Sequence, residues 1–190
     1  DPTNPWTTRA AELAPKVAQY EHDGTFFRDE LRVLGAAGLL SLPYAEEIGG
    51  GGQPYEVYLQ VLEEIGSAWA SVGVGTSVHA LSCFGLFTAG TAQQKQDWLP
   101  DMLSGERLGA YCLSEQLAGS DVGSMTTRAT GEGGSDDEPA SYRLRGRKAW
   151  ISHAGHADYY TTFARTSGDG GRGLSCFVVP ADATGLSFGT

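Results

Sequence analysis

The densest group of hydrogen-bonding side chains and glycines lies in the stretch Tyr111–Ser124, which reads YCLSEQLAGSDVGS. A strand-like apolar segment ends at Leu113, and a turn containing Gly119, Ser120 and Gly123 follows. Glycine permits backbone conformations closed to other residues and lets a ligand approach the main chain. Successive N–H groups in such a turn can form an anion-binding concavity. The same residues also suit an ordinary turn whose Ser and Asp side chains bond its own amides, and this stretch alone favours that interpretation.

A second segment with chemical potential, GRKAWISHAG, begins at Gly146. We predict a strand over Lys148–Ser152. Because strand side chains alternate between faces, Lys148, Trp150 and Ser152 would share one face. An aromatic plate beside a hydroxyl suits a flat heteroaromatic ligand. An isolated Trp is more often a core residue, so this segment alone leaves two interpretations open.

The composition limits the class of protein. The chain has 190 residues, of which 41% are hydrophobic, enough for a sizeable core. Its net charge of −10 argues against binding nucleic acid or an anionic membrane, although a small phosphate site can use backbone N–H groups. No membrane-spanning run or leader pattern is evident, so a cytoplasmic protein is expected.

The cysteines and histidines do not indicate a metal site. Cys83, Cys112 and Cys176 are far apart and are expected to be reduced, buried thiols. His153 and His156 are close together but have no third ligand nearby.

The fold that must position the two segments is expected to be α+β. Residues 1–107 show helical periodicity and are predicted to form an N-terminal, all-α domain. Pro15 should interrupt its first helix, and Pro100 should begin a separate turn after its last. The fourth helix is apolar on nearly all sides, so core packing is the predicted role of its later residues. Helices are predicted over 8–21, 27–40, 55–65, 68–87 and 91–98. The residues at the end of the fourth helix for which core packing is predicted are Leu81, Phe84, Phe87 and Thr88.

Residues 108–190 are predicted to form a second, β domain. Short alternating segments rich in Val, Thr, Tyr and Phe fit an antiparallel sheet or small barrel. The segment 131–140, GEGGSDDEPA, is expected to be a solvated hairpin loop. The last residues, GLSFGT, resemble the start of another strand, so we expect this domain to be incomplete and the chain to be a fragment of a longer enzyme. Strands are predicted over 108–113, 126–130, 141–144, 148–152, 159–165 and 174–179.

Together the two segments resemble the acyl-CoA dehydrogenase family. The first match is Leu113-Ser114-Glu115, Ala118-Gly119-Ser120-Asp121 and Gly123, and the second is Gly146, Lys148, Trp150, Ile151 and Ser152. Supporting matches upstream are Gly38-Leu39-Leu40, Pro43, Glu46-Glu47, Gly49-Gly50, Gly90-Thr91, Gln94-Lys95, Leu99-Pro100 and Gly105-Glu106. Gln116-Leu117 and His153 depart from the residues common in the family at these positions, and Ser152 replaces the more frequent Thr.

The resemblance implies a helical domain followed by a β domain that binds FAD, without the family's C-terminal helical bundle. Main-chain groups at Leu113 and Ser114 would face the isoalloxazine ring, and Ser120 would reach FAD or the acyl-CoA phosphates. Trp150 would pack beside the ring, and the Ser152 hydroxyl would approach its N5. The full set of implied cofactor-binding residues is Tyr111, Cys112, Leu113, Ser114, Gly119, Ser120, Trp150, Ile151 and Ser152, and Ser120 is also the implied substrate-binding residue.

The implied reaction is α,β-dehydrogenation of an acyl-CoA thioester with hydride transfer to flavin N5. The general-base Glu would lie in the C-terminal domain, and Glu115 is expected to stabilise nearby amides instead. The resemblance further implies β-oxidation of fatty acids, electron-transfer flavoprotein as acceptor, and a homodimer or homotetramer. Two alternatives stay open: an acyl-CoA oxidase or flavin monooxygenase of the same fold, and a non-catalytic subunit of a heteromeric assembly.

Overall fold

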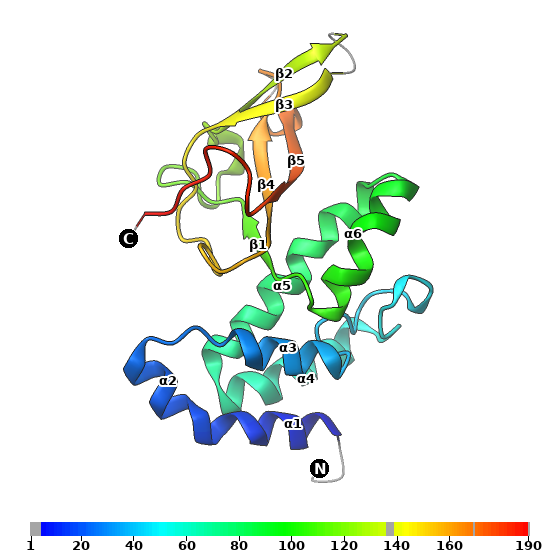
Figure 1. Cartoon of the computed structure of the whole chain (residues 1–190), viewed down its shortest axis with the longest axis vertical. Coiled ribbons are helices and arrows are strands. Elements are labelled where there is room, and N and C mark those ends of the chain that lie inside the picture. Colours follow the sequence, from blue (N-terminus) through cyan, green and yellow to red (C-terminus); the bar gives the residue numbers. More distant parts are fainter. Residues whose placement is uncertain (1–4, 136–138, 169, 190) are drawn as a thin grey trace.

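The computed structural model describes residues 5–135, 139–168 and 170–189. Among these residues, six α-helices occupy the first part of the chain and five strands the second (Figure 1). We call these parts the helical half and the β half. The α+β architecture predicted from the sequence is therefore confirmed.

The helices of the helical half lie close to their predicted positions. The first predicted helix is split by a 3₁₀ turn at Ala14–Lys16, which contains Pro15, because proline cannot donate to the helical ladder. Gly24 ends the second piece in the left-handed conformation, where glycine carries no steric penalty. The helices are α1 Pro5–Leu13, α2 Val17–Asp23, α3 Arg28–Ala36, α4 Tyr55–Ala68, α5 Ala70–Ala89 and α6 Ala92–Ser104.

The prediction of a separate turn at Pro100 is wrong. Pro100 lies inside α6, which continues to Ser104. The helix begins with a capping box, in which Thr91 Oγ1 accepts from Gln94 N at 3.2 Å and Gln94 Oε1 accepts from Thr91 N at 2.9 Å. Beyond the proline, Met102 and Leu103 are fully buried, and their packing carries the helix past the lost hydrogen bond.

The sheet of the β half is mixed, whereas the sequence predicted an antiparallel one. β4 is the central strand. β1 pairs in parallel with the first part of β4, and β2 pairs in parallel with its last residue, Arg165. β5 pairs with β4 in the antiparallel direction. β2 and β3 form an antiparallel hairpin. The predicted loop 131–140 is largely strand, except for residues 136–138, which lie outside the described residues. The strands are β1 Gly109–Cys112, β2 Arg128–Gly134, β3 Pro139–Arg145, β4 Tyr159–Arg165 and β5 Leu174–Pro180.

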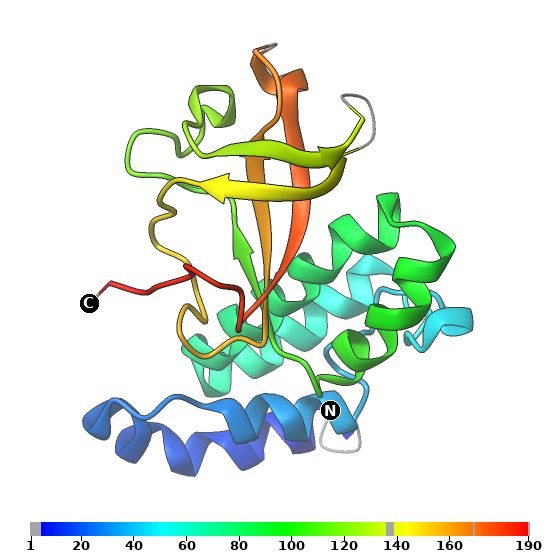
Figure 2. The ribbon, with the colours of Figure 1, turned by 45° about the horizontal axis from the view of Figure 1, so that its top comes forward.

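Helix α5 joins the two halves. It packs against α4 and α6 on one side and against β1 and β4 on the other (Figure 2). The Ser82 Oγ lies 2.9 Å from the Tyr159 hydroxyl, and Ser82 O accepts from Thr161 Oγ1 at 2.6 Å. A Cβ on Gly109 would lie 2.0 Å from Ser82 Oγ, so β1 can approach the helix only because this residue is glycine. By length and composition alone α5 could cross a membrane, but half of its apolar window is buried within the protein, as in a core helix.

One face of α5 is uncovered, contrary to the prediction of core packing. Leu81 and Phe84 are 45% and 46% exposed, and Thr88 is exposed too, whereas Phe87 packs edge-on against Tyr44. When all sides of a helix are apolar, its sequence cannot indicate which side is exposed in the folded protein. The expectation of three buried thiols also fails at one position, because Cys176 is exposed.

The junction between the halves predicts a pH-dependent stability. His79 is fully buried in α5, its Nδ1 accepts from Gly109 N at 3.0 Å, and its Nε2 lies 2.7 Å from Met102 O. Only the neutral ring with hydrogen on Nε2 satisfies both contacts. Burial lowers the pKa of His79 to about 4. The unfolded chain therefore binds more protons below about pH 6.5, and stability is lost as the pH falls from there toward 4.

We expect the His79 contribution to cost about 2 kcal/mol of unfolding free energy between pH 7 and pH 5. Urea unfolding of the wild type and of His79→Gln at both pH values measures it, because Gln can accept from Gly109 and donate to Met102 without titrating. His22→Gln, at an exposed position, is the control. An equal loss of stability in wild type and His79→Gln would contradict this role.

Candidate functional site

The turn after β1 is built around a two-residue tip. Glu115 N donates to Ala118 O at 3.0 Å, and Ala118 N donates back to Glu115 O at 3.1 Å. The tip residue Leu117 is 88% exposed. Gly119 and Ser120 follow on the exposed side, and a Cβ on Gly119 would meet nothing within 4 Å. The main chain at 119–120 is therefore accessible to a ligand.

The structure brings the two sequence segments together. Lys148 Nζ donates to Leu113 O at 3.0 Å, and Ala149 N donates to Ser114 O at 2.9 Å. The predicted strand over Lys148–Ser152 is wrong, since this segment is irregular and Trp150 adopts a φ of +56°. Lys148, Trp150 and Ser152 consequently do not share a strand face. Strand alternation could not reveal the left-handed residue that redirects the chain.

Glu115 stabilises nearby amides, as the sequence predicted. Its carboxylate accepts from Thr126 N at 2.8 Å, Thr126 Oγ1 at 2.6 Å, Thr127 N at 2.9 Å and Lys148 Nζ at 3.0 Å. Burial alone would raise the pKa of Glu115, but the hydrogen bonds from Thr126 and Thr127 outweigh it and lower the pKa to about 2. Burial lowers the pKa of Lys148, against the effect of the adjacent carboxylate. A carboxylate held ionised at four donors is a structural anchor and a poor proton acceptor.

Trp150 is the most conspicuous apolar side chain of the site. It is 78% exposed, and its positive φ is a conformation that costs a bulky residue about 1 kcal/mol or more. Strain of this kind persists only where surrounding structure imposes it, and it clusters at ligand sites. An exposed aromatic ring held in this way fits a planar aromatic ligand.

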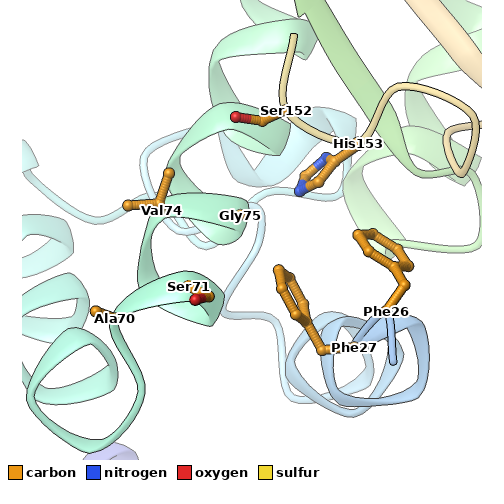
Figure 3. Close-up of a pocket in the computed structure, with 8 residues that line it drawn as sticks. All are labelled: Phe26, Phe27, Ala70, Ser71, Val74, Gly75, Ser152 and His153. Carbon is orange, nitrogen blue, oxygen red and sulfur yellow. The ribbon is translucent and has the colours of Figure 1, made fainter. Parts of the chain in front are cut away.

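Ser152 lies at a hollow between the two halves, with a cavity volume of about 480 Å³. Figure 3 shows Ser152 and His153 on the loop side, Phe26 and Phe27 facing them, and α5 forming the remaining wall. A Cβ on residue 75 would lie 2.8 Å from Phe27 Cε2 and 2.9 Å from His153 Nε2, so glycine allows these two rings to pack closely against α5. No local pattern indicates that Phe26 and Phe27, more than 120 positions before Ser152, line the same hollow.

His153 is a buried residue of the junction. It is 6% exposed, has a φ of +67°, and its Nδ1 lies 2.8 Å from Gly109 O. Burial lowers the pKa of His153, so the neutral ring donates from Nδ1. Its Nε2 is buried with no hydrogen-bond partner among the described residues. No group of three His, Cys, Asp or Glu residues in the described ranges could hold a metal ion.

The remaining predicted residues divide between the two faces of β1. Cys112 is buried in a small apolar cluster with Ala110 and Tyr160, against which Ile151 packs. Tyr111 points to the opposite face and packs edge-on against Phe163. The side chain of Cys112 thus supports the site from the core, so only its main chain could reach a ligand, whereas Ile151 is partly buried against the same cluster.

A cationic side chain whose role the sequence did not indicate holds the C-terminal end of the loop that follows β1. Arg165, the last residue of β4, donates to Gly123 O at 2.6 Å, Gly170 O at 2.8 Å, Met125 O at 3.2 Å and Ser167 O at 3.4 Å. Its own N donates to Thr127 O at 2.8 Å. Lys148 and Arg165 therefore hold the stretch Leu113–Met125 at its two ends. No local pattern relates either cation to that stretch.

Comparison with known proteins agrees with this arrangement. Residues 8–106 match the model of the acyl-CoA dehydrogenase N-terminal domain, and residues 110–190 match that of the acyl-CoA dehydrogenase middle domain. The mitochondrial short-chain specific acyl-CoA dehydrogenase of Mus musculus is 37% identical over 180 residues, which cover 94% of this chain and 42% of that protein. The chain thus spans less than half the length of this curated relative.

Solved structures show the same fold. Butyryl-CoA dehydrogenase from Megasphaera elsdenii superposes with a TM-score of 0.86 at 28% identity, covering 97% of this chain and 50% of that one. A glutaryl-CoA dehydrogenase from Mycobacterium smegmatis in complex with FADH2 gives a TM-score of 0.84 at 25% identity, covering 96% of this chain and 46% of that one. With both domain models matched in order along the chain, this protein belongs to the acyl-CoA dehydrogenase family.

Proposed function

We propose that this chain forms the flavin-facing part of an FAD-dependent acyl-CoA dehydrogenase, with a helical domain over 1–107 and a β domain over 108–190. The observation that carries the proposal is the strained, exposed Trp150 in the second segment, which Lys148 joins to the first at Leu113. Family membership and the relative solved with FADH2 support FAD as the cofactor.

The residues fit an FAD group in distinct roles. Main-chain groups at Leu113 and Ser114 would orient the ring, and Trp150 would cover one side of it and exclude water. The accessible amides at Gly119 and Ser120, with the Ser120 hydroxyl, would hold phosphate oxygens of FAD or of acyl-CoA. The Ser152 hydroxyl would donate a hydrogen bond at the ring edge beside the hollow. FAD itself supplies the hydride-accepting chemistry.

The α-proton of the acyl thioester needs a base that the described residues do not offer at this site. Glu115 is ionised but fully engaged with four donors, which excludes it from that task. We place the base outside residues 1–190, in agreement with the greater length of the relatives. Electron-transfer flavoprotein as acceptor, homo-oligomeric assembly, a role in β-oxidation and a cytoplasmic location stay predictions.

Anaerobic reduction tests the proposal. The protein in its full natural length is purified, its flavin is quantified from the visible spectrum, and butyryl-CoA is added without oxygen. We expect bound FAD that bleaches on addition of substrate and reoxidises slowly when air is admitted. Fast reoxidation by air would favour an oxidase or monooxygenase, and absence of flavin would favour a non-catalytic subunit.

A further inference from the structure

A single buried ion pair lies where the two segments of the proposed flavin site meet. The side chains of Glu115 and Lys148 are 5% and 11% exposed, and their Oε1 and Nζ atoms are 3.0 Å apart. Each of the other ion pairs between described residues has at least one partner that is 40% exposed or more. This pair is therefore the one most fully withdrawn from water in the described part of the chain.

A buried ion pair is a poor source of net stability. The cost of desolvating both charges offsets most of their attraction, and apolar residues of similar size often stabilise as well or better. Breaking such a pair by removing one partner is costly, because the other charge stays buried. The best-supported use of a buried pair is to fix one arrangement among several.

The arrangement fixed here is that of the main chain assigned to the flavin ring. Lys148 binds Leu113 O as well as Glu115, and the next residue, Ala149, binds Ser114 O. Glu115 in turn holds Thr126 and Thr127, the residues that lead into β2. Three separate chain segments thus converge on one carboxylate and one ammonium group, and Trp150 follows Lys148 by two positions.

We propose that Glu115 and Lys148 are a pair of positioning residues that set the register between Leu113–Ser114 and Trp150, and thereby the affinity for FAD and its electronic environment. This inference rests on the proposed function. Lys148 also draws electron density from the Leu113 carbonyl, which strengthens the donor on the other side of the same peptide group, the Ser114 N–H. Because the charges of Glu115 and Lys148 are opposite and adjacent, the intact pair has little net effect on the electrostatic potential at the flavin site.

The chain contains a matched control pair. Lys16 Nζ contacts Glu30 Oε1 at 2.8 Å and Oε2 at 2.9 Å, and Glu30 is 3% exposed. This pair joins α3 to the turn that contains Pro15, within the helical half. It contains the same two residue types, again with a buried carboxylate, but makes no contact with the two segments. Its variants report the effect of lost stability alone.

The test compares Glu115→Gln, Lys148→Met, Glu30→Gln and Lys16→Met in the full-length protein. FAD dissociation constants, visible spectra of the bound flavin and flavin reduction potentials are measured. We expect both site variants to bind FAD at least about tenfold more weakly than wild type, as for other residues that orient a ligand shell. Their reduction potentials should move in opposite directions, upward in Glu115→Gln and downward in Lys148→Met, because the charge left behind is opposite.

If the FAD dissociation constants of Glu115→Gln and Lys148→Met were within about twofold of those of the control variants Glu30→Gln and Lys16→Met, the proposal would be overturned. Potentials that shift in the same direction would overturn it too, since they would indicate general loosening. If Lys148→Met does not fold, Lys148→Arg replaces it, with the charge kept and the donors displaced. It should weaken FAD binding without lowering the potential, and unchanged binding would contradict the positioning role. A wild type that binds no FAD would instead refute the proposed function itself.

Discussion

Gly146→Ala is expected to lower the free energy of unfolding by about 3 kcal/mol, and to release FAD with it. A Cβ on this residue would lie 2.3 Å from Thr127 Oγ1 and 2.7 Å from Thr127 Cα. Thr127 cannot move aside, because its N is bonded to Glu115 and its O to the main chain of Arg165. Chemical denaturation of the full-length protein measures the loss.

Gly66→Ala is the matched control for this change. A Cβ on Gly66 would meet nothing within 4 Å, and the residue lies inside α4. Alanine at such a helix position should leave stability unchanged or raise it by up to about 1 kcal/mol. If Gly146→Ala were as stable as Gly66→Ala, the close approach of the second segment to Thr127 would be refuted.

Replacing Arg165 by Gln is the second change for which we expect a large effect, a loss of about 3 kcal/mol. The guanidinium group binds four carbonyl oxygens from two turns, and a shorter amide cannot reach them together. The turn at Val122–Ser124 should loosen, so FAD should also bind more weakly. Calorimetry and FAD titration of the full-length protein give the two readouts.

Arg143→Gln provides the comparison for Arg165. Arg143 is 64% exposed and pairs with Glu132 on the β2–β3 hairpin, so its loss should cost less than about 1 kcal/mol. Arg165→Lys separates charge from geometry, because an ammonium group cannot reproduce the planar fork. A Lys variant as stable as wild type would contradict the role assigned to the fork.

The elements with a strong local signal could be predicted from the sequence. Apolar periodicity located the helices, and alternation located β4, whose predicted bounds agree with Tyr159–Arg165. The capping residue Thr91 and the interruption at Pro15 also follow from local chemistry. These features depend on residues within a few positions of one another.

Features that depend on tertiary contacts could not be predicted. The parallel pairing of β1 with β4 joins residues some fifty positions apart, and the uncovered face of α5 depends on what lies beside it. Trp150 was expected on a strand face, but its backbone is left-handed, and the nearby Lys148 is tied to Leu113, 35 positions away in the sequence. The residue types of the site were evident from the sequence, whereas the contacts that position them required the structure.

Amide hydrogen exchange of the full-length protein with and without FAD tests the central claim most directly. We expect FAD to slow exchange at Leu113–Ser120 and at Trp150–Ser152, and to leave the α1–α2 region around Lys16 unchanged. Lys148→Met should reduce the protection in both site segments at equal FAD. Binding of FAD with protection elsewhere, and none in these two segments, would contradict the account.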